Sequence, residues 1–163
     1  MDYVKFYRDV YKEFSRLTPV DFDCGRLCRS RCCRGDNDAG MILFPHEREL
    51  LETVDFLQIR TIPVYGIQTD CAFCRGKCVR AIRPLSCRIY PFAPLLSDDG
   101  ITVAPDPRAY SSCILLRPEA TAKINPMFIG KIEECFTMFI EIPEMLEFMI
   151  FYTAMLEDYS RFF

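Results

Sequence analysis

The sequence predicts an α+β fold that is mainly α-helical, with helices at both ends around a cysteine-rich metal-binding centre and a small β-hairpin. Three observations predict this fold class. Apolar residues recur at helical spacing near both ends of the chain. Two cysteine-dense segments, 24–34 and 71–92, lie between those ends. In the same region, short apolar runs on either side of a Ser-Asp-Asp-Gly turn indicate a hairpin.

Length and composition indicate one domain. The chain has 163 residues and half of them are apolar, which is enough for a substantial core. We expect a single cysteine-cluster metal-binding domain over 1–163. Within it, the metal-binding core spans 22–113 and the C-terminal helices span 125–163.

The sequence also predicts the cellular compartment of the protein and whether it contacts a membrane. The longest apolar passage, 145–156, contains Glu147 and is too short to cross a bilayer, so we expect no membrane partner. The first residues are charged and lack the apolar stretch of a secretory signal. We therefore expect a cytoplasmic protein whose ten cysteines stay reduced.

Residues 2–17 are predicted to form an amphipathic helix. Tyr7, Tyr11 and Phe14 lie on one face at helical spacing, and Pro19 cannot continue the helix. The aromatic face is expected to pack in the core.

The first cysteine-dense segment places Cys24, Cys28 and Cys32 at every fourth residue, with Cys33 beside the last. In a regular helix their sulfurs would be stepped by roughly 6 Å along the axis, at about 1.5 Å rise per residue. Two thiolates on one zinc ion are only about 3.8 Å apart, given zinc–sulfur bonds of about 2.3 Å. Either Gly25 opens the segment into a loop, or different cysteines bind different metals.

The region after this segment is predicted to hold a helix over 46–57, with Pro45 at its start. His46 is the only histidine in the chain. A zinc-protease motif needs a second histidine four residues later, where Leu50 stands. His46 is therefore expected to be a surface residue of the first helical turn.

The second cysteine-dense segment has the short gaps that metal-binding loops use. After a brief strand predicted over 63–68, Cys71-x2-Cys74 leads into Cys74-x3-Cys78, and Cys87 returns as a further ligand. The alternative is a disulfide scaffold, because ten cysteines approach the density of small secreted proteins. The expected reducing compartment favours metal.

The hairpin is predicted over 92–104, and the proline-rich turn at 105–108 ends it. This turn is expected to present Cys113 as a final ligand for one site. The alternative for Cys113 is a plain buried thiol.

The last part of the chain is predicted to form helices over 126–140 and 143–159. Asn125 caps the first of them, with proline at the first helical position. Cys135 lies among apolar residues of that helix and is expected to be structural, since free cysteine is often buried.

The run Arg83-Pro-Leu-Ser-Cys87-Arg-Ile-Tyr-Pro91, with Cys74-x3-Cys78 before it and the upstream Cys32-Cys33 pair, resembles CxxCxxCC-type cysteine-cluster proteins. The resemblance takes in roughly 22–113, and the small bacterial members of the family are similar to this chain. That family is described as a zinc- or iron-chelating domain. A related cluster occurs in flagellin lysine-N-methylase, which implies iron–sulfur chemistry coupled to methyl transfer.

The resemblance also implies a set of metal ligands. They are Cys24, Cys28, Cys32, Cys33, Cys74, Cys78, Cys87 and Cys113. This chain departs from the family pattern in two ways. Its first motif is C-x3-C-x3-CC where the family has C-x2-C-x2-CC, and Cys71 is additional to the pattern and is an alternative to Cys74.

From these residues we expect a structural or redox module that binds zinc or an iron–sulfur cluster and acts with a protein partner. Spacing does not separate the two cofactors, because thiolates hold both. The first alternative is an enzyme, either an iron–sulfur-dependent protein methylase or a small redox catalyst. The second is a nucleic-acid-binding zinc module, because nine of the 20 Lys and Arg residues lie in the cysteine-dense segments. With a net charge of −3, these bases are better explained as balancing thiolates, and we expect no nucleic-acid partner.

Overall fold

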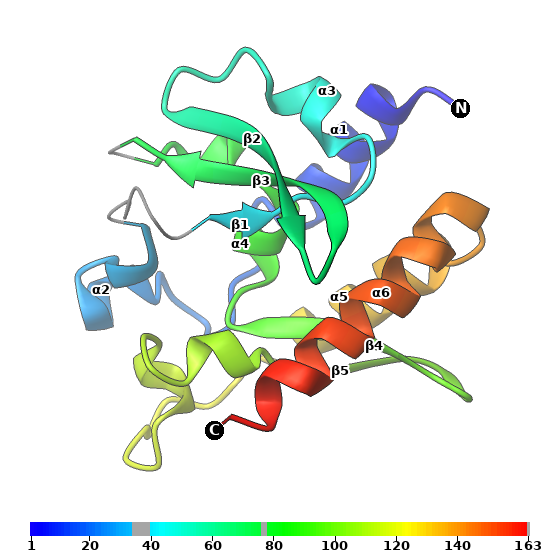
Figure 1. Ribbon diagram of the computed structural model, residues 1–163. Coiled ribbons are helices and arrows are strands. Elements are labelled where there is room, and N and C mark those ends of the chain that lie inside the picture. The colour runs from blue at the N-terminus through cyan, green and yellow to red at the C-terminus, as the bar shows by residue number, and fades with distance from the viewer. Residues whose placement is uncertain (34–39, 76–77, 163) are drawn as a thin grey trace.

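A computed structural model describes residues 1–33, 40–75 and 78–162, except for the side chain of Cys33 (Figure 1). The α-helices are α1 Tyr3–Glu13, α2 Gly25–Cys28, α3 Glu47–Leu51, α4 Leu85–Ile89, α5 Pro126–Phe139 and α6 Pro143–Ser160. The strands are β1 Met41–Ile42, β2 Leu57–Val64, β3 Ile67–Cys74, β4 Phe92–Ser97 and β5 Gly100–Pro105. Short 3-10 turns are η1 Arg31–Cys33, η2 Arg80–Ile82, η3 Pro107–Ala109 and η4 Ile114–Leu116.

The first sheet is antiparallel, with strand order β1-β3-β2. Strands β2 and β3 form a hairpin in which Leu57 is paired with Cys74 and Val64 with Ile67. Tyr65 and Gly66 connect them, and both have positive φ angles, of 48° and 82°. Two successive residues of this kind make the turn that matches the twist of paired strands.

The second sheet is the β4–β5 hairpin, in register from Phe92 and Pro105 to Ser97 and Gly100. It confirms the hairpin predicted over 92–104. Gly100 has φ +114°, a conformation that L side chains rarely adopt, so the glycine of the Ser-Asp-Asp-Gly turn is required there.

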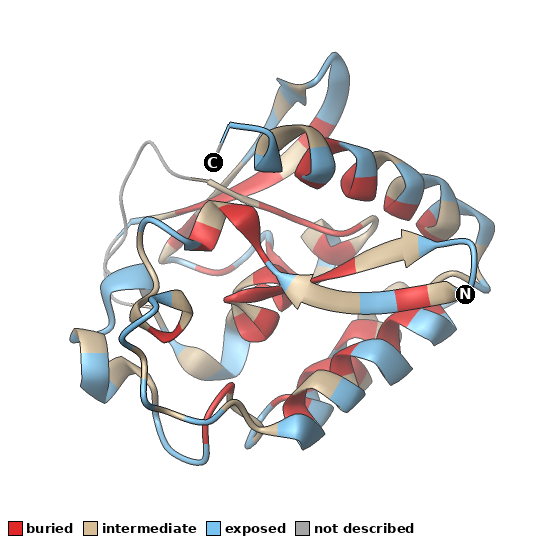
Figure 2. Cartoon of the chain, turned by 90° about the horizontal axis from the view of Figure 1, so that it is seen from below, coloured by how far each residue is buried: buried red, intermediate tan, exposed pale blue. Residues whose placement is uncertain are grey.

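The core is built mainly from the inward faces of α1, α5 and α6 and from the residues around β1. Aromatic rings of α1 contact α5: Phe6 lies against Phe139 at 5.0 Å between centroids, and Phe14 against Phe128 at 6.1 Å. Phe44 contacts Phe136 of α5 and Tyr152 of α6. Figure 2 shows the long helices with one buried face and one exposed face, as an amphipathic pattern predicts.

The predicted fold class is wrong. The chain is a mixed α+β protein with two separate sheets, and it is not mainly α-helical with one small hairpin. Nor do the helices flank a central metal site from both ends, because α1 and α5 share one core. The error has a physical reason: apolar spacing shows which face of a helix is buried, but not which element covers it.

Two helix boundaries also differ from prediction. The helix predicted over 2–17 ends at Glu13, and the one predicted over 46–57 is only α3, because β2 begins at Leu57. The C-terminal helices begin at Pro126 and Pro143 as predicted, and the Asn125 side chain accepts a hydrogen bond from the Met127 amide. Over the described residues, no helix has both the length and the apolar character needed to span a membrane.

Candidate metal centre

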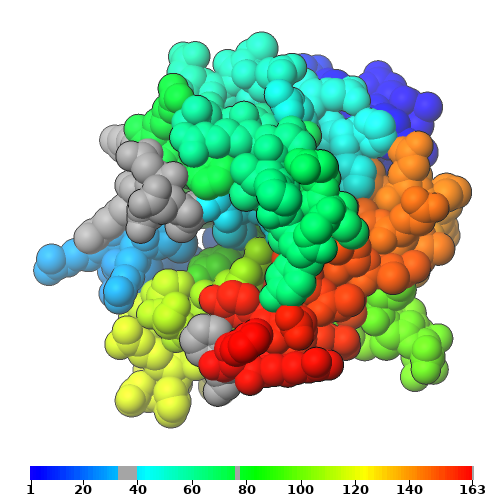
Figure 3. Space-filling model, in the orientation of Figure 1, coloured from blue at the N-terminus to red at the C-terminus, as the bar shows by residue number. Residues whose placement is uncertain are grey.

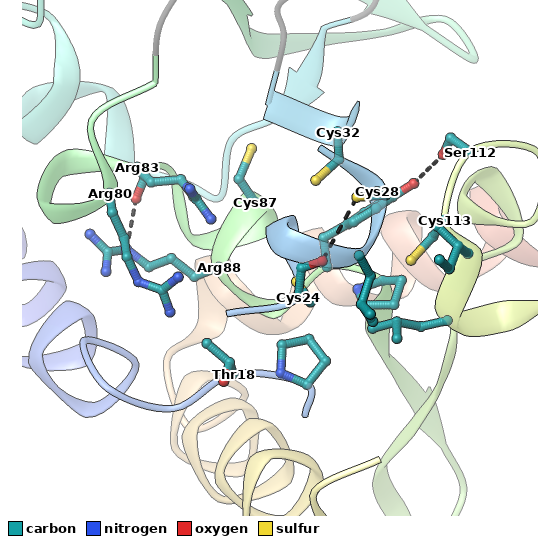
Figure 4. Close-up of a pocket in the computed structure, with 16 residues that line it drawn as sticks. Thr18, Cys24, Cys28, Cys32, Arg80, Arg83, Cys87, Arg88, Ser112 and Cys113 are labelled. Atoms are coloured by element: carbon teal, nitrogen blue, oxygen red, sulfur yellow. Dashed lines mark hydrogen bonds between the residues drawn. The ribbon is translucent and has the colours of Figure 1, made fainter. Parts of the chain in front are cut away.

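Five of the predicted ligands line one small cavity of about 40 Å³. We call it the thiol pocket, and its cysteines are Cys24, Cys28, Cys32, Cys87 and Cys113. They come from three separate parts of the chain: the α2–η1 segment, helix α4, and the segment before η4. Figure 4 shows their sulfur atoms arranged around the same space.

The α2–η1 segment is not a continuous helix. Helix α2 ends at Cys28, and the next two residues, Arg29 and Ser30, have left-handed φ angles of 54° and 55°. This reversal places Cys32 beside Cys28 at the thiol pocket instead of a full helical step away (Figure 4). Gly25 lies inside α2, so it does not open the segment as the first alternative expected, and the break lies at Arg29 and Ser30 instead.

Helix α4, which carries Cys87, is held at its first residue by a buried carboxylate. Glu47 is completely buried, and its Oε1 atom accepts a hydrogen bond of 2.6 Å from the Leu85 amide. The same carboxylate accepts from the Tyr11 hydroxyl and the Phe44 amide. Burial raises the pKa of Glu47, although these hydrogen bonds act in the opposite direction. Glu47 thus links α1, α3 and α4, the helix that carries Cys87.

Arg88, next to Cys87, is a buried structural cation. Its guanidinium lies 3.9 Å from the centroid of the Tyr11 ring. It donates to the backbone oxygens of Arg83 at 2.7 Å and Ala81 at 2.8 Å. Arg88 therefore fixes the 81–83 loop against α1, and Arg83 of this loop lines the thiol pocket.

Cys113 is placed by the turn that follows β5. Its amide donates to the Ala109 oxygen at 2.8 Å, and Cys113 is the residue that precedes η4. Nearby, the hydroxyls of Tyr90 and Ser112 are 2.5 Å apart and both residues line the thiol pocket. Burial raises the pKa of the Cys113 thiol, so its proton must be displaced before it can bind a metal.

Cys74 and Cys78 form a second pair beside the thiol pocket. Burial, and then the neighbouring Cys78, raise the pKa of Cys74. Cys78 accepts a hydrogen bond of 3.4 Å from Nε of Arg83, and Arg83 also lines the thiol pocket. Arg83 thus connects the two groups of cysteines.

The remaining cysteines are placed elsewhere. Cys71 and Cys74 are three residues apart on β3, so their side chains are on opposite faces of the sheet. Cys71 is 2% exposed and lines a different cavity, so it is not a member of the thiol pocket. Cys135 is 1% exposed in α5, as expected for a structural cysteine. The side chain of Cys33 lies outside the described residues.

The donor set of the thiol pocket fits a thiophilic metal. Among the described residues, its lining contains five cysteines and no Asp, Glu or His side chain. Among the residues that the structure describes, no three His, Cys, Asp or Glu side chains already stand close enough to hold a metal ion. A bound metal would therefore have to draw the sulfurs inward, which rotation about the single χ1 bond of each cysteine allows.

Sequence reasoning missed the residues that support the thiol pocket. Tyr90 and Arg88 belong to the Arg83–Pro91 run, so the motif itself was a signal that they mattered. Glu47 gave no such signal, because a glutamate in a charged helical turn is expected at the surface.

Comparison with known proteins does not identify a family for this chain. No protein-family model matches this chain, and neither a curated protein nor a solved structure matches it. The resemblance to the CxxCxxCC-type proteins therefore rests on the cysteine and arginine motifs alone.

Proposed function

We propose that this chain binds zinc or an iron–sulfur cluster through its clustered cysteines and acts as a structural or redox module with a protein partner. The observation that carries the proposal is the thiol pocket itself. Cys24, Cys87 and Cys113 are far apart in the sequence, yet all three line one small cavity. Sulfur donors that meet in this way are what thiophilic metals require.

The size of the thiol pocket favours an ion or a small cluster over an organic substrate. Its volume is about 40 Å³. Pockets for small organic ligands occupy about 300–1,000 Å³. The proposal is therefore a metal-binding module and not an enzyme that takes a substrate at this position.

The arginines around the thiol pocket support an anionic centre. Four thiolates around one Zn²⁺ carry a net charge of −2, and the wall of the pocket includes Arg80, Arg83 and Arg88. Arg83 already donates to one of the proposed sulfur ligands, Cys78. Hydrogen bonds of this kind orient metal ligands and adjust the properties of the metal they hold.

The test is metal analysis of protein purified without oxygen, together with its visible spectrum. Bound zinc gives a colourless protein, and an iron–sulfur cluster gives a brown one with matching iron and acid-labile sulfide. Cys87→Ala and Cys113→Ala should reduce the metal content and lower the melting temperature, because metal binding contributes to folding free energy.

Cys135→Ala is the matched control, since Cys135 is a buried thiol that does not line the thiol pocket. It should leave the metal content unchanged. Wild-type protein with only trace metal would contradict the proposal. So would equal metal content in the wild type and in Cys87→Ala.

A further inference from the structure

A second cavity, of about 340 Å³, is lined by residues of the β1-β3-β2 sheet and of α6. We call it the apolar cavity. Its apolar lining residues are Ile42, Ile62, Val64, Phe73 and Met155. None of the proposed metal ligands whose side chains are described lines it, so it is distinct from the thiol pocket.

The cavity arises because the sheet is held against α6 at the hairpin tip. Ile62 and Val64 alternate along β2, and strand geometry turns both to the same face of the sheet. At the tip, Tyr65 lies beside Asp158 of α6; desolvation and a hydrogen bond to this carboxylate raise the pKa of Tyr65. Figure 3 shows the tip lying against the C-terminal part of α6. The apolar face of the β2–β3 hairpin therefore forms one wall of the apolar cavity, and α6 contributes to the opposite wall.

Of the described residues that line this cavity, Arg108 carries the charged side chain. Its Nε and Nη2 atoms donate to the carboxylate of Asp106, the shortest of these bonds being 2.6 Å. Nη2 also donates to the Tyr152 hydroxyl at 2.9 Å. Asp106 and Tyr152 are both buried, so the guanidinium is held in one orientation.

The N–H groups of the third guanidinium nitrogen, Nη1, are not used in these hydrogen bonds. Over residues 1–33, 40–75 and 78–162, the hydrogen bonds of the Arg108 side chain use only Nε and Nη2. Guanidinium has five N–H donors and no acceptor, so Nη1 can donate to an oxygen atom inside the cavity. A fixed donor in an apolar cavity is the arrangement by which ligand sites orient a single polar atom.

The charges of Arg108 and Asp106 indicate which kind of ligand oxygen Nη1 would bind. Asp106 is 2% exposed and already neutralises Arg108 through the ion pair at 2.6 Å. A carboxylate ligand at Nη1 would therefore place a second negative charge close to the buried Asp106 carboxylate. A carbonyl oxygen would satisfy Nη1 without that cost. We propose that the apolar cavity binds a small, uncharged, largely apolar molecule whose single carbonyl oxygen accepts a hydrogen bond from Arg108.

The test compares three probes of the same shape: 2-acetylnaphthalene, 2-ethylnaphthalene and 2-naphthoate. Binding is measured by calorimetry on the full chain. The ketone should bind about tenfold more tightly than the hydrocarbon, as expected for a hydrogen bond to a charged group, and more tightly than the carboxylate. The carbonyl stretching frequency of the bound ketone should fall, because the oxygen accepts a hydrogen bond.

Two substitutions on the β2–β3 hairpin locate the site. Ile62→Trp fills the cavity and should abolish binding, and Val64→Trp provides a second such change if the first does not fold. Gln68→Trp is the matched control, because Gln68 is exposed and its side chain is on the other face of the sheet. Three results would overturn the proposal: no saturable binding of the ketone, equal or tighter binding of the hydrocarbon or the carboxylate, or unchanged binding in a folded Ile62→Trp or Val64→Trp protein.

Discussion

Glu47→Gln tests whether a buried carboxylate holds the helix that carries Cys87. In the native structure, Oε1 of Glu47 accepts from the Leu85 amide and the Tyr11 hydroxyl, and Oε2 accepts from the Phe44 amide at 3.1 Å. Glutamine can keep the two bonds at Oε1. Its NH₂ group then faces the Phe44 amide, so two donors oppose each other in a site with no exposure to water.

The magnitude follows from the bond that is lost. A hydrogen bond to a charged group contributes about 1.5–3 kcal/mol, and the buried Phe44 amide would be left without its acceptor. We expect Glu47→Gln to lower the free energy of unfolding by about 3 kcal/mol, a large part of the ~5–15 kcal/mol of a typical domain.

Urea denaturation followed by circular dichroism measures this change. The control is Glu52→Gln, because Glu52 is exposed and pairs with Arg48 only at the surface. That control should change the free energy of unfolding by less than about 0.5 kcal/mol. If Glu47→Gln lies within the same range, Glu47 does not anchor α4 and the explanation of how Cys87 is positioned is wrong.

Three further predictions concern the cysteines, the histidine and the strained turn. Cys74→Ala should lower the metal content and Cys71→Ala should not, since they lie on opposite faces of β3; metal analysis showing the reverse would assign the ligand to Cys71. Burial lowers the pKa of His46, but hydrogen bonds to Glu144 and Glu49 outweigh this effect, so the pKa is raised. The His46 ring also stacks on Tyr3. Protonated His46 therefore stabilises the fold fully below the ordinary pKa of 6.5, and this stabilisation is lost as the pH rises through the raised pKa. Urea midpoints from about pH 6 to about pH 8 should therefore fall less in His46→Gln than in the wild type, and parallel curves would refute this. Ser30→Gly should stabilise the protein by about 0.5–1 kcal/mol and Ser30→Ala should not, because Ser30 has φ 55°; equal urea midpoints for the two variants would show that the turn is not strained.

Local signals explain which parts of the fold could be predicted from the sequence. The Ser-Asp-Asp-Gly turn specifies the β4–β5 hairpin, and Asn125 specifies the start of α5, because each acts on its immediate neighbours. The β1–β3 pairing was missed because it joins segments far apart in the sequence. The β2–β3 hairpin was missed because Pro63 lies inside β2. Proline is accepted there because β2 is an edge strand.

The candidate site could likewise be predicted from the sequence only in part. The short gaps between cysteines predicted which residue types would gather, and the family resemblance supplied the ligand set. Neither could predict that Arg29 and Ser30 reverse the chain, since non-glycine residues seldom adopt positive φ. Nor could they separate Cys71 from Cys74, because that difference exists only once β3 is a strand with two faces. Metal ligation itself remains a prediction.

The most direct test of the central claim is X-ray absorption at the metal edge, measured on protein purified without oxygen. We expect a first coordination shell dominated by sulfur, at about 2.3 Å for zinc. The sulfur contribution should diminish in Cys87→Ala and remain unchanged in Cys135→Ala. A first shell made only of oxygen and nitrogen, or the same sulfur contribution in all three proteins, would contradict the assignment of the thiol pocket as a metal centre.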